Sequence, residues 1–177
     1  YHIWKRKKVS SSFIKKKMRR YCNLLITGTP GTGKTSLCHE LIKYKPSYNY
    51  INVGDFAKDK ELYEEYDEDY QCYVLDEDRL IEELTPLMNR DNGGVIIDYH
   101  GCDLFPVQWF DAVFVLRSSN TQLFDRLSER GYSQRKLDEN IESEIFQVIL
   151  DEAKQTFDDE IVIELQSDYT QDMERNV

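Results

Sequence analysis

Residues 23–35 read NLLITGTPGTGKT, an apolar run that is followed at once by a glycine-rich segment. The apolar residues are continuous rather than alternating, which is typical of a strand that is buried on both faces of a sheet. Residues 34–43 come next and carry Leu37, Leu41 and Ile42 on one side of a helical projection. The stretch therefore predicts a buried strand, a tight turn and a helix.

The turn itself, Gly28 to Thr35, reads GTPGTGKT and matches the pattern G-x-x-x-x-G-K-[ST] in the strand–turn–helix context that this pattern requires. Glycines let backbone N–H groups turn inward around phosphate oxygens, and the helix N-terminus adds a partial positive charge. We expect Lys34 to reach the β- and γ-phosphates of a nucleotide and the Thr35 hydroxyl to take a Mg²⁺ position. The sequence thus predicts a phosphate-binding loop, or P-loop.

The rest of the chain alternates short apolar runs with amphipathic segments. Further strands are expected at residues 50–53, 95–98, 112–117 and 161–165, and further helices at residues 75–88, 120–130 and 137–157. Asp76 stands at the N-cap position of the helix at 75–88, and Pro86 is expected to shorten or bend its far end. Alternating strands and helices with continuously apolar strands predict an α/β fold, a parallel sheet covered on both faces.

An acidic residue ends the apolar run VIID at residues 95–98, and a polar loop, YHGCD, follows it. Parallel sheets bind their ligands at the carboxyl ends of the strands. Behind a P-loop, Asp98 is therefore expected to order Mg²⁺ from its outer shell. His100 in the loop either positions a water or substrate group or serves a structural role, and Cys102 is expected to be a buried thiol.

Two arginines, Arg126 and Arg130, are four residues apart on the helix predicted at 120–130 and so share one face. They either compensate the charge that spreads over a transferred phosphoryl group or pair with carboxylates at the surface. The polar segment GYSQRK that follows is expected to form a short loop that closes over bound nucleotide.

The segment from residue 55 to residue 83 carries 13 acidic and three basic residues. It is either a solvated face or a docking surface for a basic protein segment, because it repels nucleic acid. Its start lies near the carboxyl edge of the sheet, where a second substrate is expected to bind. The residues placed there are Asn52, Gly54, Asp55 and Lys58.

The charge of the chain is unevenly distributed. The formal net charge is −10, yet residues 1–20 hold nine Lys and Arg and no acidic residue. We expect residues 1–17 to be a disordered tail or translated upstream sequence, with a nuclear address or an RNA-contacting arm as alternatives. The acidic remainder suits small-molecule chemistry or a basic protein partner rather than nucleic acid. Uninterrupted apolar runs reach only four or five residues, so no membrane-spanning segment is expected.

Several segments, in this order, resemble the adenylate kinase isoenzyme 6 family. They are GTPGTGKT, INVGDFAKD, VLDEDRLIEEL, VIIDYHGCDLFP, RLSERGY and IFQVILDEA. The resemblance runs from about Met18 to the C-terminus. Members of that family begin near the position of Met18 and continue for about one helix beyond that of Val177. Lys58 stands where they often have Arg, a change from a bidentate fork to a point charge.

The resemblance implies a P-loop NTPase fold, a three-layer sandwich with a five-stranded parallel sheet, over residues 18–177. It places a region that binds the nucleoside monophosphate (NMP) at about residues 52–75 and a short lid at about 130–137. It implies phosphoryl transfer from Mg-ATP to AMP or a related monophosphate, with accompanying ATP hydrolysis. ATP would be held by Gly31, Thr32, Gly33, Lys34, Thr35, Ser36 and Arg130, and catalysis would involve Lys34, Asp98, His100, Arg126 and Arg130.

The resemblance also implies a nuclear and cytoplasmic location and a role in maturation of the small ribosomal subunit through a basic ribosomal protein. A rival function is that of an ATP-driven assembly factor, in which nucleotide turnover controls binding of that partner. A more distant rival is a kinase that acts on another small acceptor.

Overall fold

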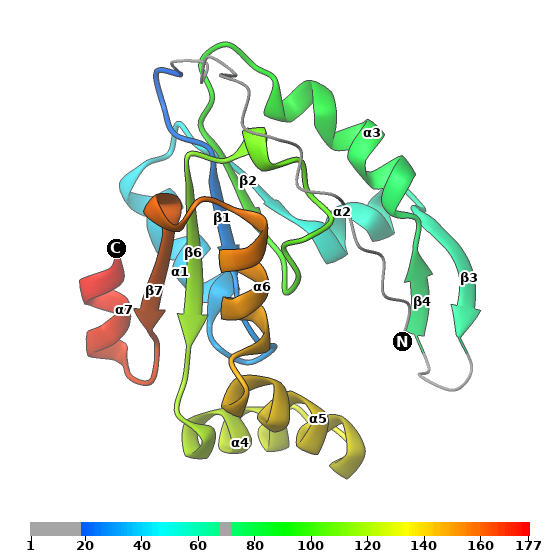
Figure 1. Cartoon of the computed structure of the whole chain (residues 1–177), viewed down its shortest axis with the longest axis vertical. Helices are drawn as coiled ribbons and strands as arrows, with labels where there is room; N and C mark the ends of the chain where they lie inside the picture. The colour runs from blue at the N-terminus through cyan, green and yellow to red at the C-terminus, as the bar shows by residue number, and fades with distance from the viewer. Residues whose placement is uncertain (1–18, 68–71) are drawn as a thin grey trace.

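Five parallel strands form the central sheet of the protein (Figure 1). In their order across the sheet they are β2 (Asn49–Asn52), β5 (Val95–Asp98), β1 (Leu24–Thr27), β6 (Ala112–Arg117) and β7 (Val162–Gln166). The computed structural model describes residues 19–67 and 72–177, so the predicted basic tail at residues 1–17 lies outside the described residues. The predicted five-stranded parallel sheet is confirmed.

The strand that precedes the P-loop, β1, lies at the centre of this sheet. Leu24 is aligned with Ile96 of β5 on one side and with Ala112 of β6 on the other. At the far edge, Asn52 of β2 is aligned with Asp98 of β5. Because all strands are parallel, this register brings the ends of β1, β2 and β5 to one edge of the sheet.

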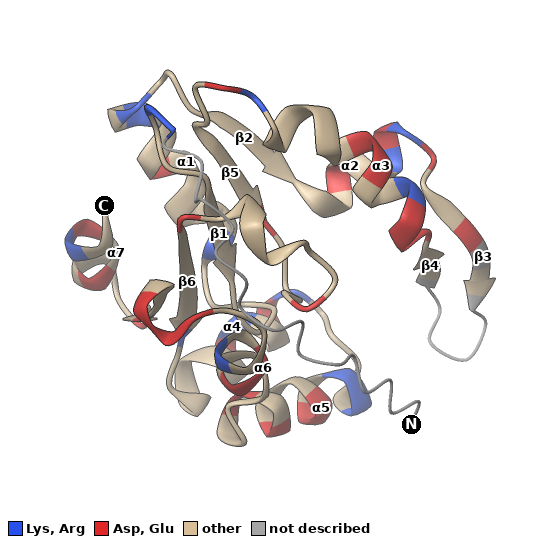
Figure 2. Cartoon of the chain, turned by 45° about the horizontal axis from the view of Figure 1, so that its top comes forward, with Lys and Arg blue, Asp and Glu red and all other residues tan. Residues whose placement is uncertain are grey.

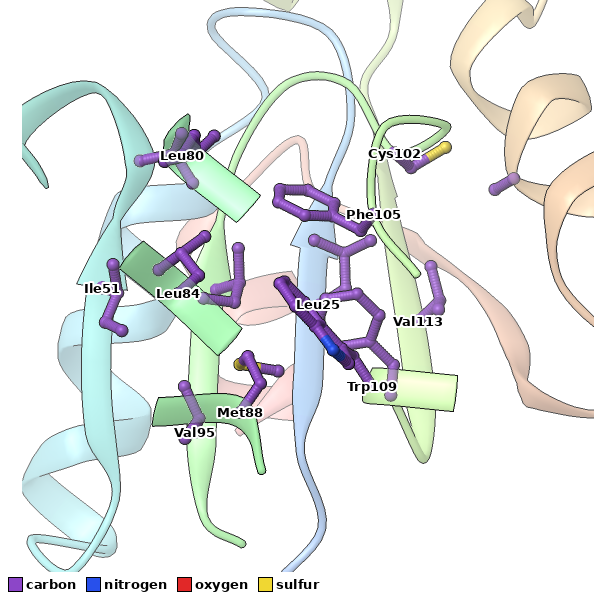
Figure 3. Close-up of a cluster of buried hydrophobic side chains, with 14 of the residues drawn as sticks. Leu25, Ile51, Leu80, Leu84, Met88, Val95, Cys102, Phe105, Trp109 and Val113 are labelled. Carbon is purple, nitrogen blue, oxygen red and sulfur yellow. The ribbon is translucent and has the colours of Figure 1, made fainter. Parts of the chain in front are cut away.

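Helices cover both faces of the sheet, which gives three layers (Figure 1). On one face, α3 (Glu77–Met88) and α6 (Val148–Thr156) pack on the larger apolar cluster. Figure 3 shows part of that cluster, with Leu84 and Met88 of α3 and the ring of Trp109 beside Leu25. On the other face, α1 (Lys34–Tyr44) and α7 (Thr170–Asn176) pack on a second cluster around Ile26.

The segment after β2 forms a helix and a hairpin that stand apart from the central sheet. The helix α2 (Val53–Asp59) starts directly after β2, so the strand predicted at 50–53 ends one residue earlier than expected. An antiparallel pair follows, β3 (Tyr63–Asp67) and β4 (Cys72–Leu75), which projects from the body (Figure 1). None of the helices in the described ranges is long and apolar enough to span a membrane.

The prediction of one helix over residues 137–157 is wrong. The structure has two helices there, α5 (Gln134–Ile145) and α6, and the break lies at Phe146 and Gln147. Gln147 adopts a φ of 55°, in the left-handed region that interrupts a right-handed helix. Both segments are amphipathic, so the sequence periodicity did not reveal the break. The preceding helix, α4 (Asn120–Glu129), agrees with the prediction to within a residue.

Pro86 does not shorten α3, contrary to one of the two effects expected of it. Asp76 caps α3 as predicted, since its carboxylate accepts from the Arg79 N–H at 3.0 Å. The helix nevertheless continues through Pro86 to Met88, so its far end is not shortened. A short 3₁₀ helix at Val107–Trp109 and another at Asp159–Ile161 complete the elements of the described residues.

The cluster beneath α3 predicts a large effect of a single truncation. Leu84 is fully buried, so Leu84→Ala should lower the free energy of unfolding by about 2–5 kcal/mol through lost burial and a residual cavity. Val107 is 50% exposed, and Val107→Ala should change it by no more than about 0.5 kcal/mol. Urea denaturation measures both values. Equal effects of the two variants would contradict this assignment of the core.

Candidate active site

The P-loop follows β1 and leads into the N-terminus of α1, as predicted. Gly28 has a φ of 138°, and a Cβ atom built there would lie 2.4 Å from the carbonyl oxygen of Leu116 in β6. Gly31 has a φ of 95°, and its Cβ would lie 2.8 Å from Leu123 Cδ1. Both positions therefore require glycine for two reasons: the positive φ, and the close approach of the neighbouring strand or helix.

The ammonium group of Lys34 is held by main-chain carbonyls. Its Nζ donates to the carbonyl oxygen of Gly28 at 2.8 Å and to that of Thr29 at 3.2 Å. Burial lowers the pKa of Lys34 to about 8, while the nearby Asp98 carboxylate opposes the shift. A desolvated ammonium group in a loop of backbone amides is suited to binding an anion such as a nucleotide phosphate.

The carboxylate of Asp98 lies beside the Thr35 hydroxyl. Asp98 is 2% exposed, and its Oδ2 atom accepts from Thr35 Oγ1 at 2.7 Å, Asn52 Nδ2 at 2.9 Å and the Tyr50 hydroxyl at 3.0 Å. Burial and the charge of Asp98 raise the pKa of Tyr50, so its hydroxyl stays protonated and donates. Three donors on Oδ2 fix the orientation of this carboxylate.

These oxygen atoms fit the prediction of a magnesium site. A hydroxyl and a carboxylate 2.7 Å apart supply the oxygen ligands that Mg²⁺ prefers, directly or through its water molecules. Thr35 would hold the ion and Asp98 would order its outer shell. Within residues 19–67 and 72–177 there is no group of three or more His, Cys, Asp and Glu that could hold a metal alone. Nucleotide phosphates would complete the coordination, as is usual for this ion.

His100 follows Asp98 in the loop at the carboxyl end of β5. Its ring lies 4.3 Å from that of Tyr99, centroid to centroid. Burial lowers the pKa of His100, and the positive charge of Lys34 lowers it further. The imidazole is therefore neutral at pH 7 and able to accept a hydrogen bond. Cys102, two residues on, is fully buried as predicted.

A cavity of about 310 Å³ brings most of the predicted residues together. The predicted residues that line it are Gly31, Gly33, Lys34, Thr35, Ser36, Asn52, Gly54, Asp98, His100 and Arg130. Three further residues line it: Pro30 of the predicted P-loop, Tyr132 of the predicted lid and Tyr99, none of which the sequence reasoning singled out. It also missed Tyr50, which acts through Asp98. Nothing in the pattern around Tyr50 distinguishes it from an ordinary strand residue.

Three predicted binding residues do not line this cavity. Thr32 is fully buried, and its hydroxyl donates to the Thr29 carbonyl oxygen at 2.9 Å. The backbone N–H of Asp55 donates to Asn52 Oδ1 at 3.1 Å, which caps α2. Lys58 is exposed in the last turn of α2. Asn52 thus has two structural bonds, one to α2 and one to Asp98.

The two predicted arginines lie in different surroundings. Arg130 lines the cavity, whereas Arg126 does not. The guanidinium of Arg126 donates to the carbonyl oxygens of Gly31, Ser167 and Asp168 and to Ser118 Oγ. Arg126 therefore ties α4 to the P-loop and to the segment after β7, and its role in catalysis stays a prediction. Arg130 follows the last residue of α4 as its C-cap and so leaves the shared face.

The predicted lid at 130–137 is partly helical. Arg130 and Tyr132 line the cavity, and Gly131 between them makes the turn with a φ of 72°. The helix α5 begins at Gln134 and is capped by Ser133. The loop between α4 and α5 therefore comprises only residues 130–133.

Comparisons with known proteins agree with this geometry. Residues 24–147 match the AAA domain family. An adenylate kinase isoenzyme 6 homolog of Caenorhabditis elegans is 46% identical over 159 residues, which cover 90% of this chain and 87% of the relative. The chain belongs to the adenylate kinase isoenzyme 6 family. The homolog of Drosophila melanogaster is 49% identical, with 82% of each chain covered, and that of Saccharomyces cerevisiae is 44% identical, with 90% and 80% covered.

The fold is shared more widely. The crystal structure of shikimate kinase from Bacteroides thetaiotaomicron superposes with a TM-score of 0.56 at 17% sequence identity, over 88% of this chain and 93% of that chain. At this identity the likeness concerns the fold alone. Membership of the adenylate kinase isoenzyme 6 family supports a P-loop nucleotide kinase-like function.

The buried ammonium group predicts a trade-off between stability and binding. Lys34→Met should raise the free energy of unfolding at pH 7 by up to about 3 kcal/mol, since it removes a desolvated charge, and should strongly weaken ATP binding. The folded-state pKa is about 8 and the unfolded value 10.5, so the wild type pays this penalty fully below pH 8 and loses it by pH 10.5. The stability gain of Lys34→Met should therefore shrink over that interval.

Thermal and urea unfolding between pH 7 and pH 10.5 measures this gain. Lys43→Met is the matched control, because Lys43 lies on the same helix with an exposed side chain. The control should show neither the stability gain at pH 7 nor the loss of ATP binding. A pH-independent difference between Lys34→Met and wild type would show that the ammonium group is not desolvated.

Proposed function

We propose that this protein transfers the γ-phosphoryl group of Mg-ATP to AMP or a related nucleoside monophosphate. The observation that carries the proposal is the cavity that joins the P-loop to Asn52 and Gly54 at the start of α2. One end of this cavity presents phosphate-binding groups, and the other lies where the family resemblance places the acceptor. The names of the relatives support adenosine nucleotides as substrates.

The residues that line the cavity account for an in-line transfer without a covalent enzyme intermediate. An oxygen of the acceptor phosphate attacks the γ-phosphorus while the bond to the bridging oxygen of the β-phosphate breaks, so that ATP and AMP become two molecules of ADP. Lys34 and the loop amides hold the β- and γ-phosphates, and Arg130 compensates the charge that spreads over the moving group. Thr35 would hold Mg²⁺, with Asp98 in its outer shell, and the ion would supply neutralisation of charge on the phosphates.

ATP hydrolysis should accompany the transfer. Water reaches a phosphoryl-transfer site unless a closing segment excludes it. Here the loop available for closure comprises residues 130–133, followed at once by α5. The neutral imidazole of His100 lies in the same cavity and is able to position either a water molecule or the acceptor.

The transfer is tested by ADP production from Mg-ATP with and without AMP. We expect AMP to accelerate ADP formation by about tenfold or more, with two ADP molecules formed for each ATP consumed, and slow hydrolysis without AMP. Lys34→Ala should reduce both activities by roughly 10²–10³-fold. If AMP leaves the rate unchanged while hydrolysis persists, the kinase proposal is wrong. GMP, CMP and UMP in the same assay establish the preference for the acceptor base.

We further propose a protein partner, a basic ribosomal protein of the small subunit, and a nuclear and cytoplasmic location. The support is the acidic surface on α2, α3 and the β3–β4 hairpin (Figure 2). On the hairpin, Tyr66 and Tyr73 are 50% and 61% exposed, and their ring centroids lie 5.0 Å apart. Carboxylates and exposed aromatic faces together suit Arg and Lys side chains. An ATP-driven assembly factor that controls this partner is the second candidate function.

Neutralising the acidic residues at positions 64–69, which include the end of β3, tests docking separately from catalysis; this is called the hairpin variant. The variant carries amides at Glu64, Glu65, Asp67, Glu68 and Asp69. We expect its binding to an Arg- and Lys-rich ribosomal-protein segment to weaken at least tenfold in a salt-dependent way, with kcat and KM for ATP within about twofold of wild type. Fluorescence anisotropy and the ADP assay measure these quantities.

A control with the same net charge replaces five exposed acidic residues on other elements by amides. They are Glu142, Asp151, Asp159, Glu160 and Glu174. If this control weakens peptide binding as much as the hairpin variant does, the peptide responds only to the net charge of the protein, and the docking proposal is wrong. Lost partner binding with intact kinetics would show that the docking surface and the catalytic site are separate, and unchanged binding would contradict the docking proposal.

A further inference from the structure

Glu144, near the end of α5, places a buried carboxylate behind the P-loop. It is 3% exposed. Its Oε1 atom accepts from Arg117 Nε at 2.6 Å and from the backbone N–H of Ser118 at 3.1 Å. Its Oε2 atom accepts from the Thr29 hydroxyl at 2.5 Å. One carboxylate on α5 is thus bonded to the end of β6 and to the second residue of the P-loop.

Thr29, which Glu144 holds, also accepts three hydrogen bonds from within the P-loop through its carbonyl oxygen. The carbonyl oxygen of Thr29 accepts from Lys34 Nζ at 3.2 Å, from the Thr32 hydroxyl at 2.9 Å and from the Thr32 N–H at 3.2 Å. The side chain of Thr29 therefore points to Glu144, while its carbonyl group holds the ammonium group that meets the nucleotide. Thr29 is itself 1% exposed, so water is a poor substitute for either bond.

We propose that Glu144 is a positioning residue for ATP, which fixes the first half of the P-loop through the Thr29 hydroxyl and so pre-organises Lys34. Neither Glu144 nor Thr29 lines the cavity, so the effect is transmitted rather than direct. A bond to a buried carboxylate is stronger and more geometrically selective than one between neutral groups. Without it, the loop would have to be ordered when ATP binds, and affinity would fall.

Arg117 holds this carboxylate in place with two hydrogen bonds to Glu144. Its Nε atom donates to Glu144 Oε1, and its Nη2 atom donates to the Glu144 carbonyl oxygen at 3.0 Å. Its remaining nitrogen, Nη1, reaches the side chain of Glu164, which is 50% exposed. The inward bonds belong to the positioning arrangement, and the outward bond to Glu164 provides a control for it.

The inference is tested by binding of a non-hydrolysable Mg-ATP analogue, measured by titration calorimetry, together with steady-state kinetics. Thr29→Val keeps the shape of the side chain and removes the hydroxyl. We expect the Kd for the analogue and the KM for ATP to rise about five- to tenfold, with the KM for AMP within twofold of wild type. Thr29→Ser retains the hydroxyl and should recover at least half of this loss on a logarithmic scale.

Glu144→Gln tests the other end of the bond. It should weaken analogue binding about threefold or more. Because both substitutions alter the same bond, the double variant Thr29→Val/Glu144→Gln should bind the analogue no more than about twofold more weakly than the single variant with the higher Kd. Glu164→Gln, which removes only the exposed partner of Arg117, should leave the Kd within about 1.5-fold of wild type.

A merely structural role would give a different pattern. In that case Thr29→Val and Glu144→Gln would lower the unfolding temperature while the analogue Kd remained that of the wild type. Multiplicative losses in the double variant, or equal rises in the KM for ATP and for AMP, would also overturn the inference. The binding measurement uses no acceptor, so it stands even if AMP proves not to be the second substrate.

Discussion

The buried ammonium group of Lys34 is the constraint on which the rest of the site depends. A cation in a desolvated position requires oxygen acceptors, and two main-chain carbonyls of the P-loop, those of Gly28 and Thr29, provide them. The loop presents these carbonyls only with a positive φ at Gly28 and with β6 close against its back. A central β1, a neighbouring β6 and a glycine-rich turn are thus parts of one requirement.

The second constraint is the orientation of Asp98, which depends on sheet order. Because β2 is the neighbour of β5 and runs parallel to it, Asn52 and Asp98 are aligned and their side chains meet at 2.9 Å. Tyr50 lies two residues earlier on the same face of β2 and so reaches the same oxygen. Thr35, from the first turn of α1, adds the third bond. The sheet topology therefore fixes the acid of the site before any ligand binds.

The sequence predicts the elements whose residue types have a single strong structural meaning. GTPGTGKT and VIID are such segments, and the strands at 95–98 and 112–117 agree with prediction residue for residue. The hairpin was missed because YEEYD and CYVL carry no turn signal that marks a strand pair. Arg126 and Arg130 have the spacing of helical neighbours, yet a helix that ends at Glu129 sends them to different surroundings. Glu144 gave no signal either, since acidic residues are ordinary on an amphipathic helix.

The break between α5 and α6, which the sequence did not predict, is linked to the burial of Glu144 through Arg117. In a continuous helix the Glu144 carbonyl oxygen would accept from the N–H of residue 148. Because the helix ends here, that oxygen instead accepts from the Gln147 N–H at 3.2 Å and from Arg117 Nη2 at 3.0 Å. Arg117 thus binds both the main chain and the side chain of Glu144, and it does so only where α5 terminates. The left-handed conformation of Gln147 is therefore the local strain that lets α5 deliver a carboxylate to the P-loop before α6 turns back onto the sheet.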